Sequence, residues 1–180
     1  MNKLMLSGCA ALAMVSAAPA LAQVNGEVDV EGYVDDRCQF AILDHAIIDL
    51  GEISGDDGRL DEGAVDAGQA TLQGWCNGSA STIWVEAFPL INAAVASPSF
   101  ANRVDYRATA TAGSSAPLDD TTAAGAGAEV PLGLFNGDIV VDISNSASPG
   151  DGLMVAGDYL GRIVVTLAPN TSFESPPAAP

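Results

Sequence analysis

The sequence has few basic side chains and a single histidine. Six lysines and arginines stand against 23 acids among 180 residues, giving a formal net charge of −17. Such an acidic surface repels nucleic acid and anionic membranes, so we expect neither as a partner. A Ser-His-Asp arrangement would have to use His45, between two predicted strands. We interpret His45 as a loop or core residue, and rank an enzyme using it last.

Motifs for cofactors and metals are also missing. Asp56, Asp57, Asp61 and Glu62 lie close together, but the D-x-D-x-D-G series of an EF-hand loop is absent. We interpret these acids as a solvated turn. No glycine-rich loop precedes a predicted helix, as nucleotide binding would require. We therefore expect no catalytic residue, no cofactor and no metal site.

No apolar run is long enough for a membrane span, which needs about 20 residues. Residues 1–22 instead have the pattern of a secretory signal peptide. Lys3 supplies a positive start, an apolar stretch follows, and Ala20-Leu21-Ala22 provides the small residues of a cleavage site. We expect cleavage after Ala22 and export to the periplasm, then to the cell surface.

Cysteine is scarce, with three in the chain. Cys9 leaves with the signal peptide, so the mature chain retains Cys38 and Cys76. An even pair in an oxidising compartment predicts a disulfide.

Helical periodicity is nearly absent, and short runs with a period of two take its place. This pattern commits one face of each strand to a core and predicts an all-β sandwich of the immunoglobulin type. The apolar faces are Cys38/Phe40/Ile42, Ala70/Leu72/Gly74/Cys76, Ile83/Val85/Ala87, Val104/Tyr106/Ala108/Ala110, Ile139/Val141/Ile143 and Tyr159/Ile163/Val165/Leu167.

The remaining segments predict the domain limits. We place one sandwich domain at residues 33–168 and a disordered Pro-rich tail at 169–180. Residues 112–128, rich in Ala, Gly, Thr and Ser, predict a long mobile loop. We interpret Trp75 and Trp84 as core residues, with sugar contact as the alternative.

Residues 23–32 predict a strand at the start of the mature chain. Val24, Val28 and Val30 alternate with polar residues, and Gly26 occupies one apolar-face position. A terminal strand of this kind pairs either within its own sheet or with the exposed edge of another.

Four motifs in order resemble the fimbrial subunits of the chaperone–usher route and the related spore coat protein U family. Gly26-Glu27-Val28-Asp29-Val30-Glu31-Gly32-Tyr33-Val34 stands four residues before Cys38, and Ile48-Asp49-Leu50-Gly51 follows. Cys76 comes about forty residues after Cys38, as in pilins. Ala156-Gly157-Asp158-Tyr159 precedes the alternating Ile163, Val165 and Leu167.

The resemblance implies an immunoglobulin-like sandwich that lacks its last strand. A periplasmic chaperone fills the gap first, and after passage through an outer-membrane usher the strand of another subunit replaces it. The implied donor residues are Val24, Gly26, Val28 and Val30, and the implied partners are copies of the same chain or related subunits. The Pro-rich tail departs from the family, whose chains usually end just after the last strand.

A second hypothesis is a self-contained secreted adhesion or matrix-binding module. In that case the strand at residues 23–32 pairs within its own sheet.

Overall fold

The computed structural model describes residues 25–41, 44–150 and 152–169. The chain divides into two compact units, residues 1–33 and 34–180, which are considered separately. The described part of the first unit, residues 25–33, contains no strand and no helix. The predicted signal peptide and all but the first residue of the predicted tail lie outside the described residues.

Strands dominate the second unit, which confirms the predicted all-β class. The one described helix is α1 (Glu62–Asp66). The described strands are β1 (Cys38–Phe40), β2 (Gln69–Cys76), β3 (Thr82–Ile91), β4 (Phe100–Ala101), β5 (Arg103–Ala112), β6 (Leu118–Asp120), β7 (Val130–Pro131), β8 (Phe135–Ala147), β9 (Leu153–Met154) and β10 (Leu160–Ala168).

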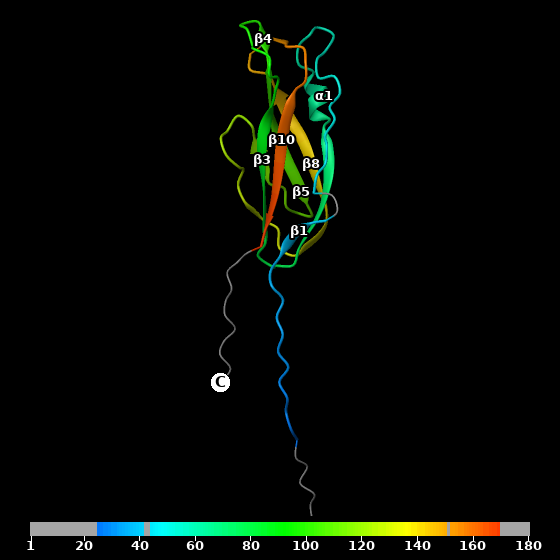
Figure 1. Cartoon of the computed structure of the whole chain (residues 1–180), viewed down its shortest axis with the longest axis vertical. Helices are drawn as coiled ribbons and strands as arrows, with labels where there is room; N and C mark the ends of the chain where they lie inside the picture. The colour runs from blue at the N-terminus through cyan, green and yellow to red at the C-terminus, as the bar shows by residue number, and fades with distance from the viewer. Residues whose placement is uncertain (1–24, 42–43, 151, 170–180) are drawn as a thin grey trace, which may run out of the picture. The chain divides into compact units, whose positions relative to one another are not determined.

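Strands β4 and β9 form a separate parallel pair. The other eight described strands follow one hydrogen-bonded path that folds into two layers (Figure 1). Its order is β1-β2-β8-β5-β3-β10, with β6 added to β5 and β7 added to β3. β5 pairs with β8 from Asp105 to Ala112, but with β3 only through Arg103 and Val104. The path therefore turns between layers at the start of β5. One layer is β1-β2-β8-β5 and the other is β3-β10.

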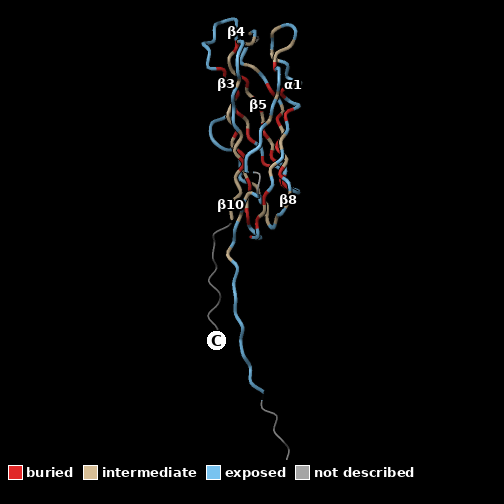
Figure 2. The backbone as a smooth tube through the Cα atoms, turned by 45° about the vertical axis from the view of Figure 1, so that its right-hand side comes forward, coloured by how far each residue is buried: buried red, intermediate tan, exposed pale blue. Residues whose placement is uncertain are grey.

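The core lies between these layers, on the faces that the alternation predicts. Alternate side chains are buried along the whole of β5, along β3 as far as Ala87, and in the central part of β8. Figure 2 shows these buried positions in red along the strands. Among the fully buried side chains are Ile83, Val85, Val104, Ala108, Ala110 and Ile139.

The two tryptophans are an exception to the prediction. Trp75 lies between the buried Gly74 and Cys76, and Trp84 lies between the buried Ile83 and Val85. Alternation therefore turns both indole rings to the outer faces, where they are half-buried. The interpretation of Trp75 and Trp84 as core residues is wrong.

The predicted disulfide joins Cys38 to Cys76, directly opposite each other in the β1–β2 ladder. Asn77 adds hydrogen bonds beside it. The N–H of Arg37 donates to Asn77 Oδ1, and Asn77 Nδ2 donates to the carbonyl of Asp35, 2.9 Å away. The chain just before β1 is thus fixed to the end of β2.

Residues 112–128 are not the single long loop that the composition predicts. They contain β6, and the Asp119 side chain is 5% exposed. The N–H of Ala87 donates to Asp119 Oδ2 at 2.8 Å, and the N–H of Gly127 donates to the carbonyl of Val85 at 2.8 Å. The segment therefore covers the part of β3 that no strand covers on that side. Gly127 also lets the segment pack closely on itself, because a Cβ there would lie 2.1 Å from the carbonyl oxygen of Leu118.

The acids predicted to form a solvated turn partly serve local structure. Asp61 caps α1 by accepting a hydrogen bond from the N–H of Ala64 at 3.1 Å. Asp66, at the other end of α1, accepts from the backbone N–H groups of Asn145 and Ser146 in β8. These bonds seat the helix on β8. In the described residues, no helix is long and apolar enough to cross a membrane.

We predict that Cys38→Ser/Cys76→Ser lowers the free energy of unfolding by about 4 kcal/mol, because a loop of this length loses its cross-link in the unfolded chain. Urea denaturation of the oxidised protein and the double variant measures the difference. Reduced wild-type protein is the matched control and should behave as the variant does. A difference below about 1 kcal/mol would show that the disulfide contributes little.

Candidate functional site

Two strands at the ends of the sheet path have an open edge. Among the described residues, β10 pairs with β3 alone, from Leu160 to Ala168, and β1 pairs with β2 alone. Figure 1 shows β3 on one side of β10 and β1 near the C-terminal end of β10. A Cβ at Gly74 of β2 would lie 2.9 Å from Leu167 Cδ1 and 3.3 Å from the carbonyl oxygen of Gln39 in β1. Leu167 therefore packs onto Gly74 of the other layer, and β1 lies close to β10.

The apolar face beside these edges is incompletely covered. Val165 is 9% exposed, whereas Ile163 and Leu167, on the same face of β10, are only partly buried. Phe40 of β1 and Ile48 and Leu50 beyond it also pack against the core while staying partly exposed. These side chains of β10 turn toward the core, and among the described residues no strand covers one flank of them.

Residues 44–50, which follow β1, belong to no strand. A Cβ at Gly68 would lie 2.9 Å from Ile48 Cγ2 and 2.7 Å from Leu50 Cδ2, so both side chains pack onto the start of β2. His45 and Ile47 are exposed, Ile47 at 78%. His45 makes no hydrogen bond or ion pair within the described residues.

Tyr159 fixes the start of β10. Its hydroxyl donates to the carbonyls of Ala101 and Val155, 2.9 and 3.0 Å away. Burial raises the pKa of this hydroxyl. The Ala156-Gly157-Asp158-Tyr159 motif thus forms a corner at which Tyr159 bonds back to the residue four positions earlier.

Residues 25–33, the N-terminal arm, present apolar side chains to solvent. Val28, Val30 and Tyr33 are 85%, 91% and 88% exposed. Gly26 and Gly32 have no atom within 4 Å of a Cβ position. Glu27, Asp29 and Glu31 alternate with the valines, whereas Val24 lies outside the described residues. The arm therefore has an unburied apolar face and an acidic face.

Arg162, on the outer face of β10, was not singled out by its sequence pattern. Its guanidinium lies over the Phe88 ring, 4.6 Å from the centroid. It is the one described arginine without a carboxylate partner. The other four form ion pairs, Arg37 with Asp35, Arg59 with Asp57, Arg103 with Asp105 and Arg107 with Asp120.

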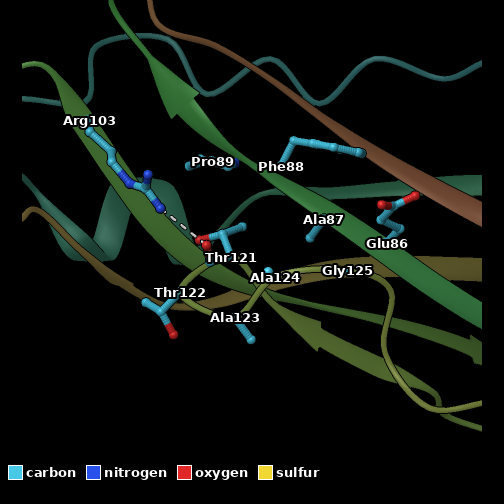
Figure 3. Close-up of a pocket in the computed structure, with 10 residues that line it drawn as sticks. All are labelled: Glu86, Ala87, Phe88, Pro89, Arg103, Thr121, Thr122, Ala123, Ala124 and Gly125. Carbon is cyan, nitrogen blue, oxygen red and sulfur yellow. Dashed lines mark hydrogen bonds between the residues drawn. The ribbon is translucent and has the colours of Figure 1, made fainter.

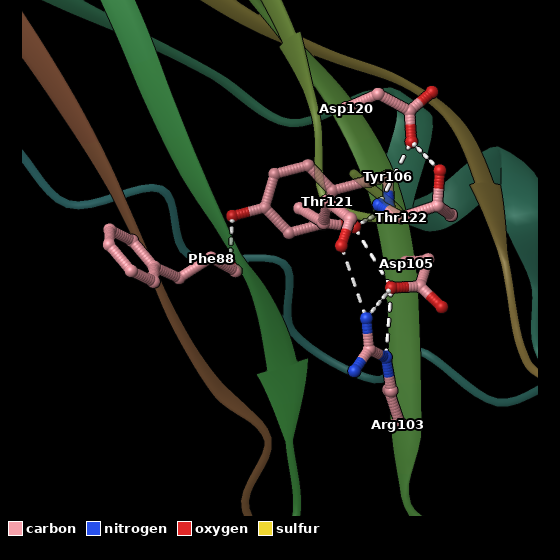
Figure 4. A network of polar contacts seen from close by, with 7 residues as sticks. All are labelled: Phe88, Arg103, Asp105, Tyr106, Asp120, Thr121 and Thr122. Atoms are coloured by element: carbon pink, nitrogen blue, oxygen red, sulfur yellow. Dashed lines mark hydrogen bonds and ion pairs between the residues drawn. The ribbon is translucent and has the colours of Figure 1, made fainter. Parts of the chain in front are cut away.

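A second feature is an open hollow of about 360 Å³ beside β3 (Figure 3). Its lining comes from β3, Arg103 and residues 121–125. Arg103 donates to Asp105 and to the carbonyl of Thr121, and the Thr121 hydroxyl also donates to Asp105 (Figure 4). These polar groups satisfy one another, which points to a structural network.

Tyr106 joins this network to the second layer. Its side chain is 2% exposed, and its hydroxyl donates to the carbonyl of Phe88 at 2.7 Å (Figure 4). Burial, with a smaller contribution from the charge of Asp119, raises the pKa of Tyr106 to about 12. Burial therefore favours the neutral phenol over the phenolate.

In the described part of the chain, no group of three or more His, Cys, Asp and Glu side chains could hold a metal ion. No family model, curated protein or solved structure matches the chain.

We predict that the free energy of unfolding falls by about 2 kcal/mol between pH 10 and pH 12 through Tyr106. Its folded-state pKa lies above the ordinary value of 10, so stability is fully present below pH 10 and is lost as the pH rises. Denaturant unfolding across this range measures the loss. Tyr106→Phe should be less stable at pH 8 and should lose this part of the pH dependence, whereas Tyr33→Phe, at an exposed position, should not. If the free energy of unfolding changed with pH in the same way for wild type and Tyr106→Phe, the prediction would be wrong.

Proposed function

We propose that this protein is a structural subunit of a surface fimbria or coat-like assembly that polymerises by donor-strand exchange. The observation that carries the proposal is a pair of features in one chain. β10 has an unpaired edge beside a partly exposed apolar face, and the N-terminal arm is an unpaired apolar segment. An unpaired strand edge can accept a strand, and the unpaired arm of another copy can supply one.

The strand order supports an immunoglobulin-like domain without its last strand. In the complete constant-type fold, one sheet has the order A-B-E-D and the other C-F-G. In the proposed correspondence, β1-β2-β8-β5 takes the places of A-B-E-D and β3-β10 takes those of C-F. The corner made by Tyr159 resembles the tyrosine corner found at the start of strand F. The absent seventh strand would lie at the open edge of β10.

An open edge of this kind favours association. Unpaired backbone N–H and C=O groups are a template for another strand, and an uncovered apolar face adds a driving force. If the arm of a second copy fills the edge, its own body still has an open edge. Such a contact does not close on itself, so it produces a filament.

The family resemblance supplies the rest of the proposal. On this proposal Val24, Gly26, Val28 and Val30 enter the neighbour's edge, and a periplasmic chaperone and an outer-membrane usher handle the subunit before assembly. The disulfide between Cys38 and Cys76 is compatible with export to an oxidising compartment. The final location is the cell surface or fimbrium.

The alternative is a self-contained secreted adhesion or matrix-binding module. It requires the arm to pair within its own sheet. Residues 25–33 belong to no strand, which favours assembly over this alternative.

We predict that Val28→Asp/Val30→Asp abolishes assembly of the exported full-length protein. The two valines would lose about 3–6 kcal/mol of apolar burial in the neighbour's edge, and two charges would be buried instead. Ladders that resist heat in detergent, together with sedimentation, measure assembly. Glu27→Gln/Asp29→Asn, on the opposite face of the arm, is the matched control and should still assemble. If the wild-type protein were a stable monomer that did not bind a synthetic peptide of residues 23–34, the proposed function would be wrong.

A further inference from the structure

We propose that Glu31 of one copy pairs with Arg162 of the next, and that this ion pair sets the register of the exchanged strand. The inference rests on the proposed function and adds a specificity-determining pair to it. In this register Val30 lies opposite Ile163, Val28 opposite Val165, and Gly26 opposite Leu167.

Antiparallel pairing follows from the ends of β10. Antiparallel ladders are somewhat more stable per residue than parallel ones. A parallel arm would also bring the second body to the Ala168 end, where β1 approaches β10 and the chain continues past Ala168. An antiparallel arm brings that body to the Leu160 end instead.

Strand alternation restricts the register further. Ile163, Val165 and Leu167 point inward from β10, and directly opposite residues of two strands lie on the same face. The apolar positions 26, 28 and 30 of the arm must therefore stand opposite odd-numbered positions of β10. The acids at 27, 29 and 31 then stand opposite even-numbered positions, which include Arg162.

Charge selects among the remaining registers. Arg162 is the described arginine without an acid partner, although the chain has a large excess of acids. Glu27, Asp29 and Glu31 make no ion pair within the described residues. Opposite charges directly across an antiparallel ladder stabilise it. The arm therefore places one of its acids at Arg162.

The regular part of β10 then favours Glu31 over Asp29. With Glu31 opposite Arg162, Gly26 faces Leu167, near the end of β10 that β1 approaches. Residues 25–31 then pair with 168–162, the part of β10 that follows its irregularity between Leu160 and Arg162. With Asp29 at Arg162, Val30 would face this irregular position and Glu31 would face the exposed Leu160.

The test is a charge exchange between arm and acceptor. The acceptor is the full-length chain carrying Val28→Asp/Val30→Asp, so that its own arm does not compete. Fluorescence anisotropy measures its binding of a labelled peptide of residues 23–34. We expect Glu31→Arg in the peptide to weaken binding by about fivefold, and Arg162→Glu in the acceptor to do the same. The two changes together should restore binding to within about twofold of the original.

Controls separate the register from the function. Peptides with Glu27→Arg should bind Arg162→Glu no better than the unchanged peptide does. The register would be wrong if a peptide with Asp29→Arg restored binding to the Arg162→Glu acceptor. It would also be wrong if Glu31→Arg in the peptide and Arg162→Glu in the acceptor together weakened binding as much as either change alone. Neither outcome would contradict strand exchange itself. Failure of the unchanged peptide to bind the acceptor would overturn the proposed function itself. Thermal unfolding of Arg162→Glu checks that loss of the Phe88 contact has not unfolded the acceptor.

Discussion

The open hydrogen-bonding edge of β10 is the constraint on which the rest of the molecule depends. β3, the neighbour of β10, is completed on its far side by β7, by β5 and by the polar contacts of Asp119 and Gly127. Nothing comparable covers β10 within the described residues. The two layers still share a core, because Val165 and its neighbours pack inward from β10. Within the described residues, the sheet is thus covered on the far side of β3 and has an unpaired edge at β10.

Much of this arrangement follows from the sequence. The period of two at Ile83, Val85 and Ala87 predicts a buried face because a strand turns alternate side chains to opposite sides. The pairing of Cys38 with Cys76 follows from counting the cysteines that remain outside the predicted signal peptide. The unpaired state of the arm does not follow, since the alternation at Val28 and Val30 predicts a strand without saying whose sheet it joins.

The remaining features depend on distant contacts. Asp119 lies in a low-complexity segment, and only the folded chain brings its carboxylate to the N–H of Ala87. Trp75 and Trp84 are large enough to suggest a core, but the register of their strands turns them outward. Arg162 acquires meaning only when the other arginines are seen to be paired. In each case tertiary geometry, rather than the local sequence pattern, determines what the side chain contacts.

The covalent link at the root of the arm has a mechanical consequence. If subunits are joined through their arms, a pulling force on the filament enters each body just before Cys38. The three-residue ladder of β1 alone would offer little resistance to such shear. The disulfide to Cys76, with the adjoining bonds of Asn77, passes the load into β2, which pairs with β8 along its whole length. The same cross-link that stabilises the isolated domain would thus let a chain of such domains bear tension without peeling open.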